Sequence, residues 1–189
     1  MLSYNELRPG HFIVYEGSVC EVLEADFLRM QQRKPVMKVK LRDLMSGKVK
    51  ETSFQQSNEL EEAELERMKA RFLYENKGEY WFDEAGNPKN RFKFSAQELG
   101  GKEQFLKPQT EVTALMFRDA FISVQLPVKM EFKVVMAPPA IRGNTSSGGT
   151  KQVEIETGAM INTPLFIEEG DVICVNTETG LYAERVEKA

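Results

Sequence analysis

The sequence has few of the residues on which catalysis and metal binding depend. It contains one histidine, His11, and two cysteines among 189 residues. A lone histidine without cysteine or histidine neighbours cannot assemble a zinc-type ligand set. The nucleotide-binding patterns GxGxxG and GxxxxGK[ST] and the hydrolase pattern GxSxG are also missing from the sequence. We therefore expect a protein that is not an enzyme and that uses no metal and no cofactor.

Long apolar runs and a secretory signal are missing as well. No run approaches the roughly 18 apolar residues that a membrane-spanning helix needs. The opening residues, MLSYNELRPGHF, lack a basic start followed by an apolar core. Cys20 and Cys174 lie far apart and do not form a disulfide framework. These absences predict a cytoplasmic protein with no membrane partner, and we expect a monomer.

What the sequence does contain is one dense block of positive charge. Residues 29–50 hold eight bases and one acid, a local balance of +7, in a chain whose net charge is −4. Local concentration of positive charge matters more than net charge for binding a polyanion. We expect contacts with an RNA backbone from the bases along this block: Lys38, Lys40, Arg42, Lys48 and Lys50.

The order of residues inside the block predicts its structure. Lys38, Lys40 and Arg42 alternate with apolar residues in VMKVKLRDL, which is the period of a strand with one buried and one exposed face. The cluster RMQQRKP just before them is polar and basic and indicates an exposed loop tip. The block thus predicts a positively charged hairpin that enters a phosphate-rich environment. The alternative is that these cations only keep the protein in solution.

Strand patterns dominate the rest of the chain. β-rich runs flank Glu16-Gly17, Met45-Ser46-Gly47 and Asn76-Lys77-Gly78, each a hairpin signature. Strands are also predicted within 110–127 and 128–138, and four more within 153–186, with turns at Thr157-Gly158, Glu169-Gly170 and Thr179-Gly180. The pattern predicts a mostly β protein of three consecutive small β-barrels, at residues 1–63, 64–126 and 127–189.

A few segments depart from this pattern. Residues 57–71 are acidic and rich in helix formers, with Ser57 as an N-cap candidate, and predict a short helical or irregular connector. A brief helix is predicted after Ser95. Residues 138–152 are rich in Gly, Ser and Thr and predict a long loop. The candidate site residues of the C-terminal barrel lie in this loop: Arg142, Asn144, Thr145, Ser146 and Lys151.

Tyr80, Trp81 and Phe82 form a run of three aromatic residues. Aromatic side chains on an open face can stack on nucleic-acid bases. Neighbouring side chains of a strand point to opposite faces, so we expect part of this trio to pack in a core.

Several segments together resemble the bacterial elongation factor P family, over essentially the whole chain. They are NELRPGHFIVYEGSVCEVLEAD, KVKLRDLMSGKVKETSF, FLYENKGEYWFDE, RDAFISVQLP and VEIETGAMINTPLFIEEGDVICVNTETGLYAERV. The family's C-terminal signature is K-x-A-x4-G-x2-[LIV]-x-V-P-x2-[LIV]-x2-G. It is matched at the right spacing by Lys151, Gly158, Ile161, Pro164, Ile167 and Gly170, whereas Val153 and Thr163 replace its Ala and Val.

The resemblance implies a fold and a role. It implies a KOW/SH3-like N-terminal barrel followed by two OB-type barrels, arranged as an L shaped like tRNA. It further implies a translation elongation factor that binds the ribosome between the peptidyl and exit sites, beside peptidyl-tRNA. There it would stimulate peptide-bond formation at stalling sequences such as consecutive prolines. Its partners would be ribosomal RNA, ribosomal proteins and peptidyl-tRNA. The alternative is a generic RNA-binding protein of OB and SH3-like barrels that acts away from the ribosome.

The tip differs from the family's common form. The family's loop resembles K-P-G-K-G, and its central lysine carries a β-lysyl-type extension. Counting back without gaps from VKL at 39–41 puts that lysine position at Gln32, whose amide cannot accept an acyl group as an amine does. The resemblance places a six-residue tip beside peptidyl-tRNA: Arg29, Met30, Gln31, Gln32, Arg33 and Lys34. Either the factor works unmodified, with Arg33 and Lys34 supplying the charge, or Lys34 is modified instead. A paralogue of elongation factor P with an altered tip is a further alternative.

Overall fold

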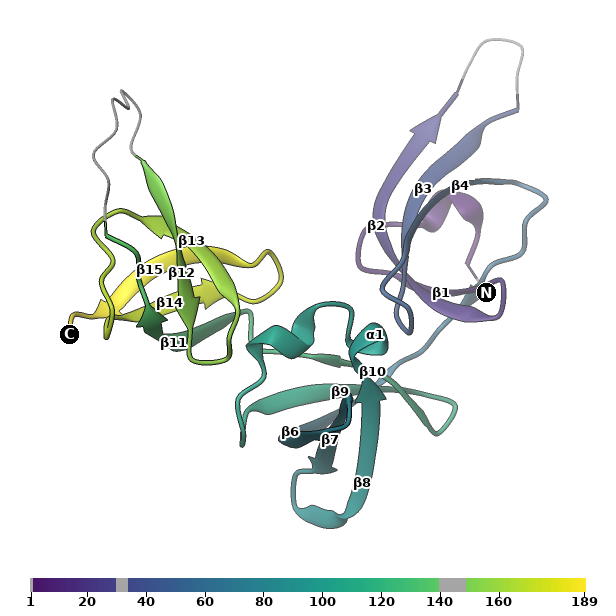
Figure 1. Ribbon diagram of the computed structural model, residues 1–189. Helices are drawn as coiled ribbons and strands as arrows, with labels where there is room; N and C mark the ends of the chain where they lie inside the picture. The colour runs from purple at the N-terminus through teal and green to yellow at the C-terminus, as the bar shows by residue number, and fades with distance from the viewer. Residues whose placement is uncertain (1, 30–33, 140–148) are drawn as a thin grey trace. The chain divides into compact units, whose positions relative to one another are not determined.

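The computed structural model describes residues 2–29, 34–139 and 149–189. Those residues are nearly all β and form three five-stranded sheets (Figure 1), so the prediction of a mostly β protein of small barrels is confirmed. By packing, the chain falls into two compact units, Met1–Gly101 with Val112–Gln125 and Lys102–Glu111 with Leu126–Ala189. The division at residues 63 and 126 stays a prediction.

The N-terminal barrel is a sheet in the order β4-β3-β2-β1-β5. Its elements are η1 (Tyr4–Glu6), β1 (Phe12–Tyr15), β2 (Ser18–Leu28), β3 (Val36–Asp43), β4 (Val49–Gln55) and β5 (Glu61–Glu62). Glu16 and Gly17 between β1 and β2 have φ of 52° and 84°. Positive φ at both turn residues gives a twist that matches the strands, which explains the tight hairpin. The hairpins predicted here and around Met45-Ser46-Gly47 are confirmed.

The core of the N-terminal barrel is apolar and includes one cysteine. Burial raises the pKa of the Cys20 thiol to about 11, so at neutral pH it is uncharged and packs as a small apolar group. Cys174 is also buried, and both cysteines are free thiols. The buried core residues are Leu7, Ile13, Cys20, Val22, Met37, Val39, Leu41, Phe54 and Leu60.

Of the two alternatives for the connector at residues 57–71, the helical one is wrong, and the irregular one holds for residues 58–59 and 63–65. This segment instead contains β5 and the start of β6 (Glu66–Asn76), and Ser57 caps no helix there. Glu61 and Glu62 pair with Val14 and Ile13 of β1. Hydrogen bonds to an open strand edge and burial of Leu60 outweigh the weak helix propensity of a short acidic run.

The central barrel is a sheet in the order β10-β9-β6-β7-β8. Besides β6 it contains β7 (Glu79–Glu84), β8 (Asn87–Ser95), α1 (Ala96–Leu99), β9 (Glu111–Phe117) and β10 (Ala120–Gln125). The short helix predicted after Ser95 is confirmed as α1. The Glu98 N–H donates to Ser95 Oγ and the Ser95 N–H to Glu98 Oε2, so each residue satisfies a free donor of the other at the helix start.

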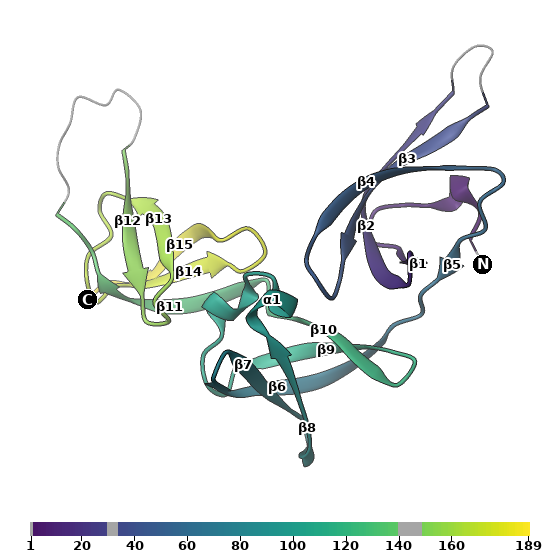
Figure 2. The ribbon, with the colours of Figure 1, turned by 45° about the vertical axis from the view of Figure 1, so that its right-hand side comes forward.

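The C-terminal barrel is a sheet in the order β13-β12-β11-β14-β15, and β13 also contacts β15 (Figure 2). Its strands are β11 (Lys129–Met136), β12 (Thr150–Ile155), β13 (Met160–Pro164), β14 (Val172–Asn176) and β15 (Leu181–Glu187). The strand predicted within 128–138 and the four predicted beyond it are confirmed. Most of the loop predicted at 138–152 lies outside the described residues, and the loop prediction is wrong at 150–152, which begin β12.

A segment from between α1 and β9 completes the core of the C-terminal barrel. Within Lys102–Glu111, η2 (Lys102–Phe105) brings the Phe105 ring into that core. The ring centroid of Phe105 lies 5.9 Å from that of Phe132 on β11. The core of this barrel is therefore built from two stretches of chain that β9 and β10 separate in the sequence.

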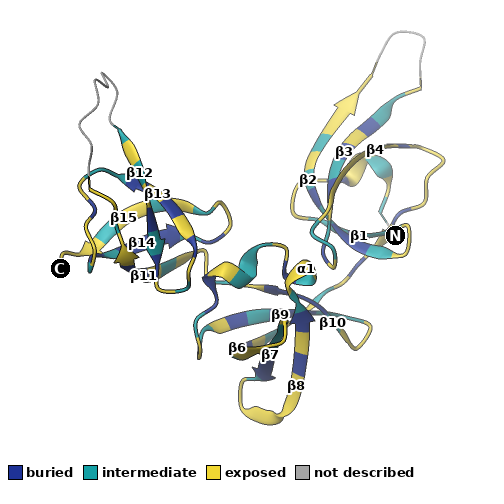
Figure 3. Ribbon diagram, in the orientation of Figure 1, coloured by how far each residue is buried: buried dark blue, intermediate teal, exposed yellow. Residues whose placement is uncertain are grey.

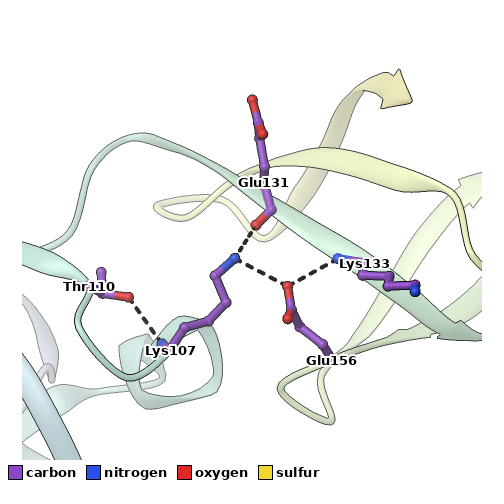
Figure 4. Close-up of polar contacts among 5 residues, drawn as sticks. All are labelled: Lys107, Thr110, Glu131, Lys133 and Glu156. Carbon is purple, nitrogen blue, oxygen red and sulfur yellow. Dashed lines mark hydrogen bonds and ion pairs between the residues drawn. The ribbon is translucent and has the colours of Figure 1, made fainter. Parts of the chain in front are cut away.

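Lys107 fixes the same segment by polar contacts (Figure 4). Its ammonium donates to the Glu131 carbonyl at 2.7 Å and to Glu156 Oε1 at 3.1 Å. The same carboxylate oxygen accepts the Lys133 N–H at 3.1 Å. The Lys107 N–H donates to Thr110 Oγ1 at 3.2 Å, which holds the loop itself. Glu156 thus joins the segment to β11 through one carboxylate.

Candidate nucleic-acid interface

Most of the described bases of residues 29–50 lie on the β2–β3 hairpin of the N-terminal barrel. β2 and β3 pair antiparallel and lead to the segment 29–35 between them. The alternation predicted for β3 is confirmed (Figure 3). Met37, Val39 and Leu41 are buried, and the cations between them point away from the core. This arrangement explains why strand geometry gathers the bases on one face.

Four of these cations are held by carboxylates, which the sequence analysis missed. The pairs are Lys38 with Glu51 (3.1 Å), Lys40 with Glu24 (3.1 Å), Arg42 with Glu21 (2.8 Å) and Lys50 with Glu16 (2.6 Å). The carboxylates come from β2, β4 and the β1–β2 turn, and all four lie outside residues 29–50. The exposed face of β3 is therefore mixed in charge. An exposed ion pair contributes only ~0.2–1 kcal/mol, so an RNA phosphate can replace the carboxylate at small cost.

The Lys50–Glu16 pair also contacts an aromatic ring. The hydrogen bond to Glu16 raises the pKa of Lys50, and the same bond lowers the pKa of Glu16. Lys50 Nζ lies 5.1 Å from the centroid of the Tyr15 ring. Both groups therefore stay charged near neutral pH, and Lys50 remains available as a cation.

The β3–β4 turn presents Lys48. Asp43 Oδ1 accepts the N–H groups of Met45 and Ser46, both at 2.8 Å. Burial alone would raise the pKa of Asp43, but these N–H donors and the Ser18 hydroxyl outweigh it and lower the pKa. Lys48 follows this turn, is exposed, and makes no ion pair with any residue that the structure describes.

The flanks of the tip are exposed and basic. Arg29 and Lys34 are both exposed, and neither forms an ion pair within the described ranges 2–29, 34–139 and 149–189. The remaining tip residues of the prediction lie outside the described residues: Met30, Gln31, Gln32 and Arg33. Phe27, which no sequence pattern had indicated, is 50% exposed two residues before the start of the tip at Arg29. Its ring centroid lies 6.3 Å from that of Tyr4. The hairpin end therefore offers an apolar surface beside its cations.

The candidate residues of the C-terminal barrel are only partly placed. Lys151 Nζ donates to the Pro138 carbonyl at 2.9 Å, which ties the two sides of the loop together. The other four candidates lie outside the described residues: Arg142, Asn144, Thr145 and Ser146.

Part of the C-terminal signature packs inside the barrel. Ile161 and Ile167 are buried, as are the two departures from the signature, Val153 and Thr163. The Thr163 hydroxyl donates to the Lys151 carbonyl at 3.4 Å, so its extra polar atom has a partner. These four buried residues therefore contribute to the fold, and both substitutions are compatible with it.

Comparison with known proteins agrees with this architecture at both ends of the chain. A family model described as elongation factor P KOW-like domain matches residues 3–60, and one described as elongation factor P, C-terminal, matches residues 130–185. Elongation factor P of Carboxydothermus hydrogenoformans is 34% identical over 98% of this chain and 100% of its own. The chain belongs to the elongation factor P family. Elongation factor P of Thermotoga maritima is 35% identical over the same shares.

Membership in the elongation factor P family makes the chain a translation elongation factor. Its N-terminal barrel is KOW-like, as predicted. A solved structure of translation initiation factor 5A from Methanococcus jannaschii matches 67% of this chain and 92% of its own, at 15% identity and a TM-score of 0.46. A likeness that low bears on neither fold nor function.

Two kinds of feature are absent from the described residues. They contain no group of three His, Cys, Asp or Glu side chains that could hold a metal ion. No helix in the same part of the chain is long and apolar enough to span a membrane.

Proposed function

We propose that this elongation factor binds the ribosome beside peptidyl-tRNA and stimulates peptide-bond formation at stalling sequences such as consecutive prolines. The observation that carries the proposal is the match to elongation factor P over 98% of the chain. The basic β2–β3 hairpin, with exposed cations on both flanks of its tip, supplies a surface suited to RNA. The factor acts as a monomer in the cytoplasm, where translation takes place.

Positioning alone suffices for this role. Proline is a rigid and poor reactant, so the rate gain comes from holding peptidyl-tRNA in a reactive geometry. Ribosomal RNA carries out the reaction, so the factor needs no catalytic group, cofactor or metal of its own. The tip would contact the acceptor end of peptidyl-tRNA, while the cations of β3 and β4 and those of the 138–152 loop contact RNA backbone.

The tip acts without a modified lysine in this proposal. Gln32 stands at the position of the family's modified lysine and reaches the tRNA end through hydrogen bonds of its amide. Arg33 and Lys34 supply positive charge. Lys34 is the nearest amine, so a modification at Lys34 is the rival to this proposal.

Removal of the tip charges tests the role of the tip. The double variant Arg33→Ala/Lys34→Ala is expected to lower rescue of a proline-stalled reporter, because two of the tip's three cations are lost. The double variant Lys129→Ala/Lys133→Ala is the matched control, since it removes two exposed cations from β11. Unchanged rescue by the tip variant, or an equal loss in the control, would count against the tip as the active element.

The salt dependence of ribosome binding tests the backbone contacts. Each phosphate contact contributes about −0.7 to −0.9 to the slope of log affinity against log salt. Lys48 has no carboxylate partner among the described residues, so Lys48→Ala is expected to make the slope shallower by about one such step. Co-sedimentation with ribosomes across a salt series gives the slope. A flat dependence for the unaltered protein would mean that the cations only solubilise it.

A further inference from the structure

The outer face of β6, β7 and β8 carries a stacked aromatic pair among cations. Cα register places Tyr74 opposite Trp81 and Trp81 opposite Lys93. The two rings are stacked, with centroids 6.3 Å apart and planes 24° from parallel. Lys93 Nζ lies 5.3 Å from the centroid of the Trp81 ring and pairs with Glu79 at 2.6 Å. The Tyr74 side of this pair remains open, since that residue is 44% exposed.

The opposite face of the same strands is the core of the central barrel. Phe72, Phe82 and Phe92 stand in register across the three strands, and all three are buried. Phe82 is one of the three consecutive aromatic residues at 80–82. It therefore packs in the core, as expected for part of this trio. Trp81, one position away on β7, faces outward, is partly buried, and stacks on Tyr74 instead of on these three rings.

Further cations lie on one side of the aromatic pair. Two register rows away, in the next row of the same outer face, Arg71 and Arg91 flank Asp83. Asp83 is buried and pairs with Arg71 at 2.6 Å. Lys69 and Lys89 lie two residues before these arginines on their strands. The outer face, which we call the platform, consists of Lys69, Arg71, Tyr74, Glu79, Trp81, Asp83, Lys89, Arg91 and Lys93.

The charge of the platform is positive and only partly compensated. Its five cations face two carboxylates, a balance of +3. Lys69, Lys89 and Arg91 form no ion pair with any residue inside the described ranges. Arg91 instead donates to the Pro88 carbonyl. A surface with stacked aromatics at its centre and uncompensated cations at its rim matches the two parts of a nucleotide, a flat base and an anionic phosphate.

We propose that the platform binds single-stranded RNA, with a base stacked on Tyr74 and phosphates held by Arg91 and the neighbouring lysines. In a five-stranded barrel of OB type, the face of the second and third strands is where oligonucleotides bind. β7 and β8 are the second and third strands of the central barrel, and the platform is centred on β7. Single-stranded RNA is favoured over duplex RNA because only unpaired bases can be splayed onto an aromatic ring. The surface is separate from the hairpin of the N-terminal barrel and its binding needs no ribosome.

Trp81 reports on this site directly, because it is the single tryptophan of the chain. The full-length protein is titrated with oligouridylate of about ten nucleotides, within the usual site size of such a barrel. Binding is expected to change the Trp81 fluorescence. Tyr74→Ala is expected to weaken binding at least about fivefold, since stacking on one aromatic side chain contributes that much or more. Tyr74→Phe keeps the ring and is expected to restore the affinity.

Controls separate stacking from charge and from loss of structure. Phe166→Ala removes an exposed ring that lies under Arg185 in the C-terminal barrel, and it is expected to leave binding unchanged. Arg91→Gln, at an exposed position, is expected to reduce the salt slope by about 0.7. The proposal is overturned if oligouridylate leaves the Trp81 fluorescence unchanged, or if inorganic polyphosphate or duplex RNA gives an equal response. Equal binding by Tyr74→Ala, in a variant with the far-UV circular dichroism of the unaltered protein, would overturn it too.

Discussion

Replacing Phe105 with alanine is expected to lower the free energy of unfolding of the C-terminal barrel by about 3–5 kcal/mol, the usual cost of emptying a buried phenylalanine site. Phe105 is 2% exposed and sits in that barrel's core, against Phe132. It belongs to the segment between α1 and β9, which are elements of the central barrel. A large effect on the C-terminal barrel would therefore show that the segment is part of that barrel's fold.

Hydrogen exchange followed by mass spectrometry measures this effect barrel by barrel. Fluorescence would not, because Trp81 is in the other compact unit. Amides of β11 and β14 should lose protection in Phe105→Ala, while those of β2 and β3 keep it. Phe166→Ala is the matched control, since that ring is 54% exposed. Loss of protection in β6–β8, with β11 and β14 unchanged, would contradict the assignment.

The second large effect is expected at Asp171, a buried carboxylate of the C-terminal barrel. Its side chain is 0% exposed. Its oxygens accept the Glu168 N–H and the Ala189 N–H, each at 3.0 Å, and Arg185 Nη1 at 3.4 Å. Asp171→Asn removes the charge but keeps the shape, and it is expected to cost about 1.5–3 kcal/mol at neutral pH. Exchange protection of β14 and β15 provides the measurement.

The same site gives the C-terminal barrel an acid-sensitive stability. Burial alone would raise the pKa of Asp171, but the N–H donors and Arg185 outweigh it and lower the pKa. A pKa lowered by folding adds stability that is complete above the unfolded value of about 3.9 and is lost as pH falls through the folded value. Asp171→Asn should therefore flatten the loss of stability below about pH 4. Glu184→Gln, an exposed carboxylate on β15, should leave it unchanged.

The strands and hairpins could be predicted because each depends on short-range chemistry. Apolar residues alternate in β3 and β11 with the period of a half-buried strand, and the structure buries those residues fully in β3 and, except for the partly buried Met130, in β11. Turns such as Glu16-Gly17 require positive φ, which favours glycine in the local sequence. The helix after Ser95 was predictable for the same reason, since its cap needs only Ser95 and Glu98.

The failures involve contacts between distant parts of the chain. Residues 57–71 favour a helix locally, but Glu61 and Glu62 complete the edge of β1, which no local pattern shows. No local sequence pattern predicts that Phe105 and Lys107 pack on the C-terminal barrel, whose strands begin at Lys129.

The candidate interface was predictable in part. The strand period correctly placed the cations of β3 on one face. Counting charge along the sequence overestimated the charge of that face, because Glu21 and Glu24 of β2 stand opposite Arg42 and Lys40. Register across a hairpin is fixed by its turn and its buried face, so a check of β2 against β3 could have found these pairs. Trp81 faced outward for the same period-2 reason that put Phe82 in the core.

The central claim is tested most directly by translation of a consecutive-proline reporter on cognate ribosomes. The chain is added after production in a host that lacks the modifying enzymes, and its intact mass confirms that Lys34 is unmodified. We predict that this protein binds the ribosomes and restores synthesis through the proline run. Relief by native protein with added mass on Lys34, but not by the unmodified protein, would contradict the unmodified tip. Failure of both forms to bind ribosomes or to relieve the stall would contradict the proposed function itself.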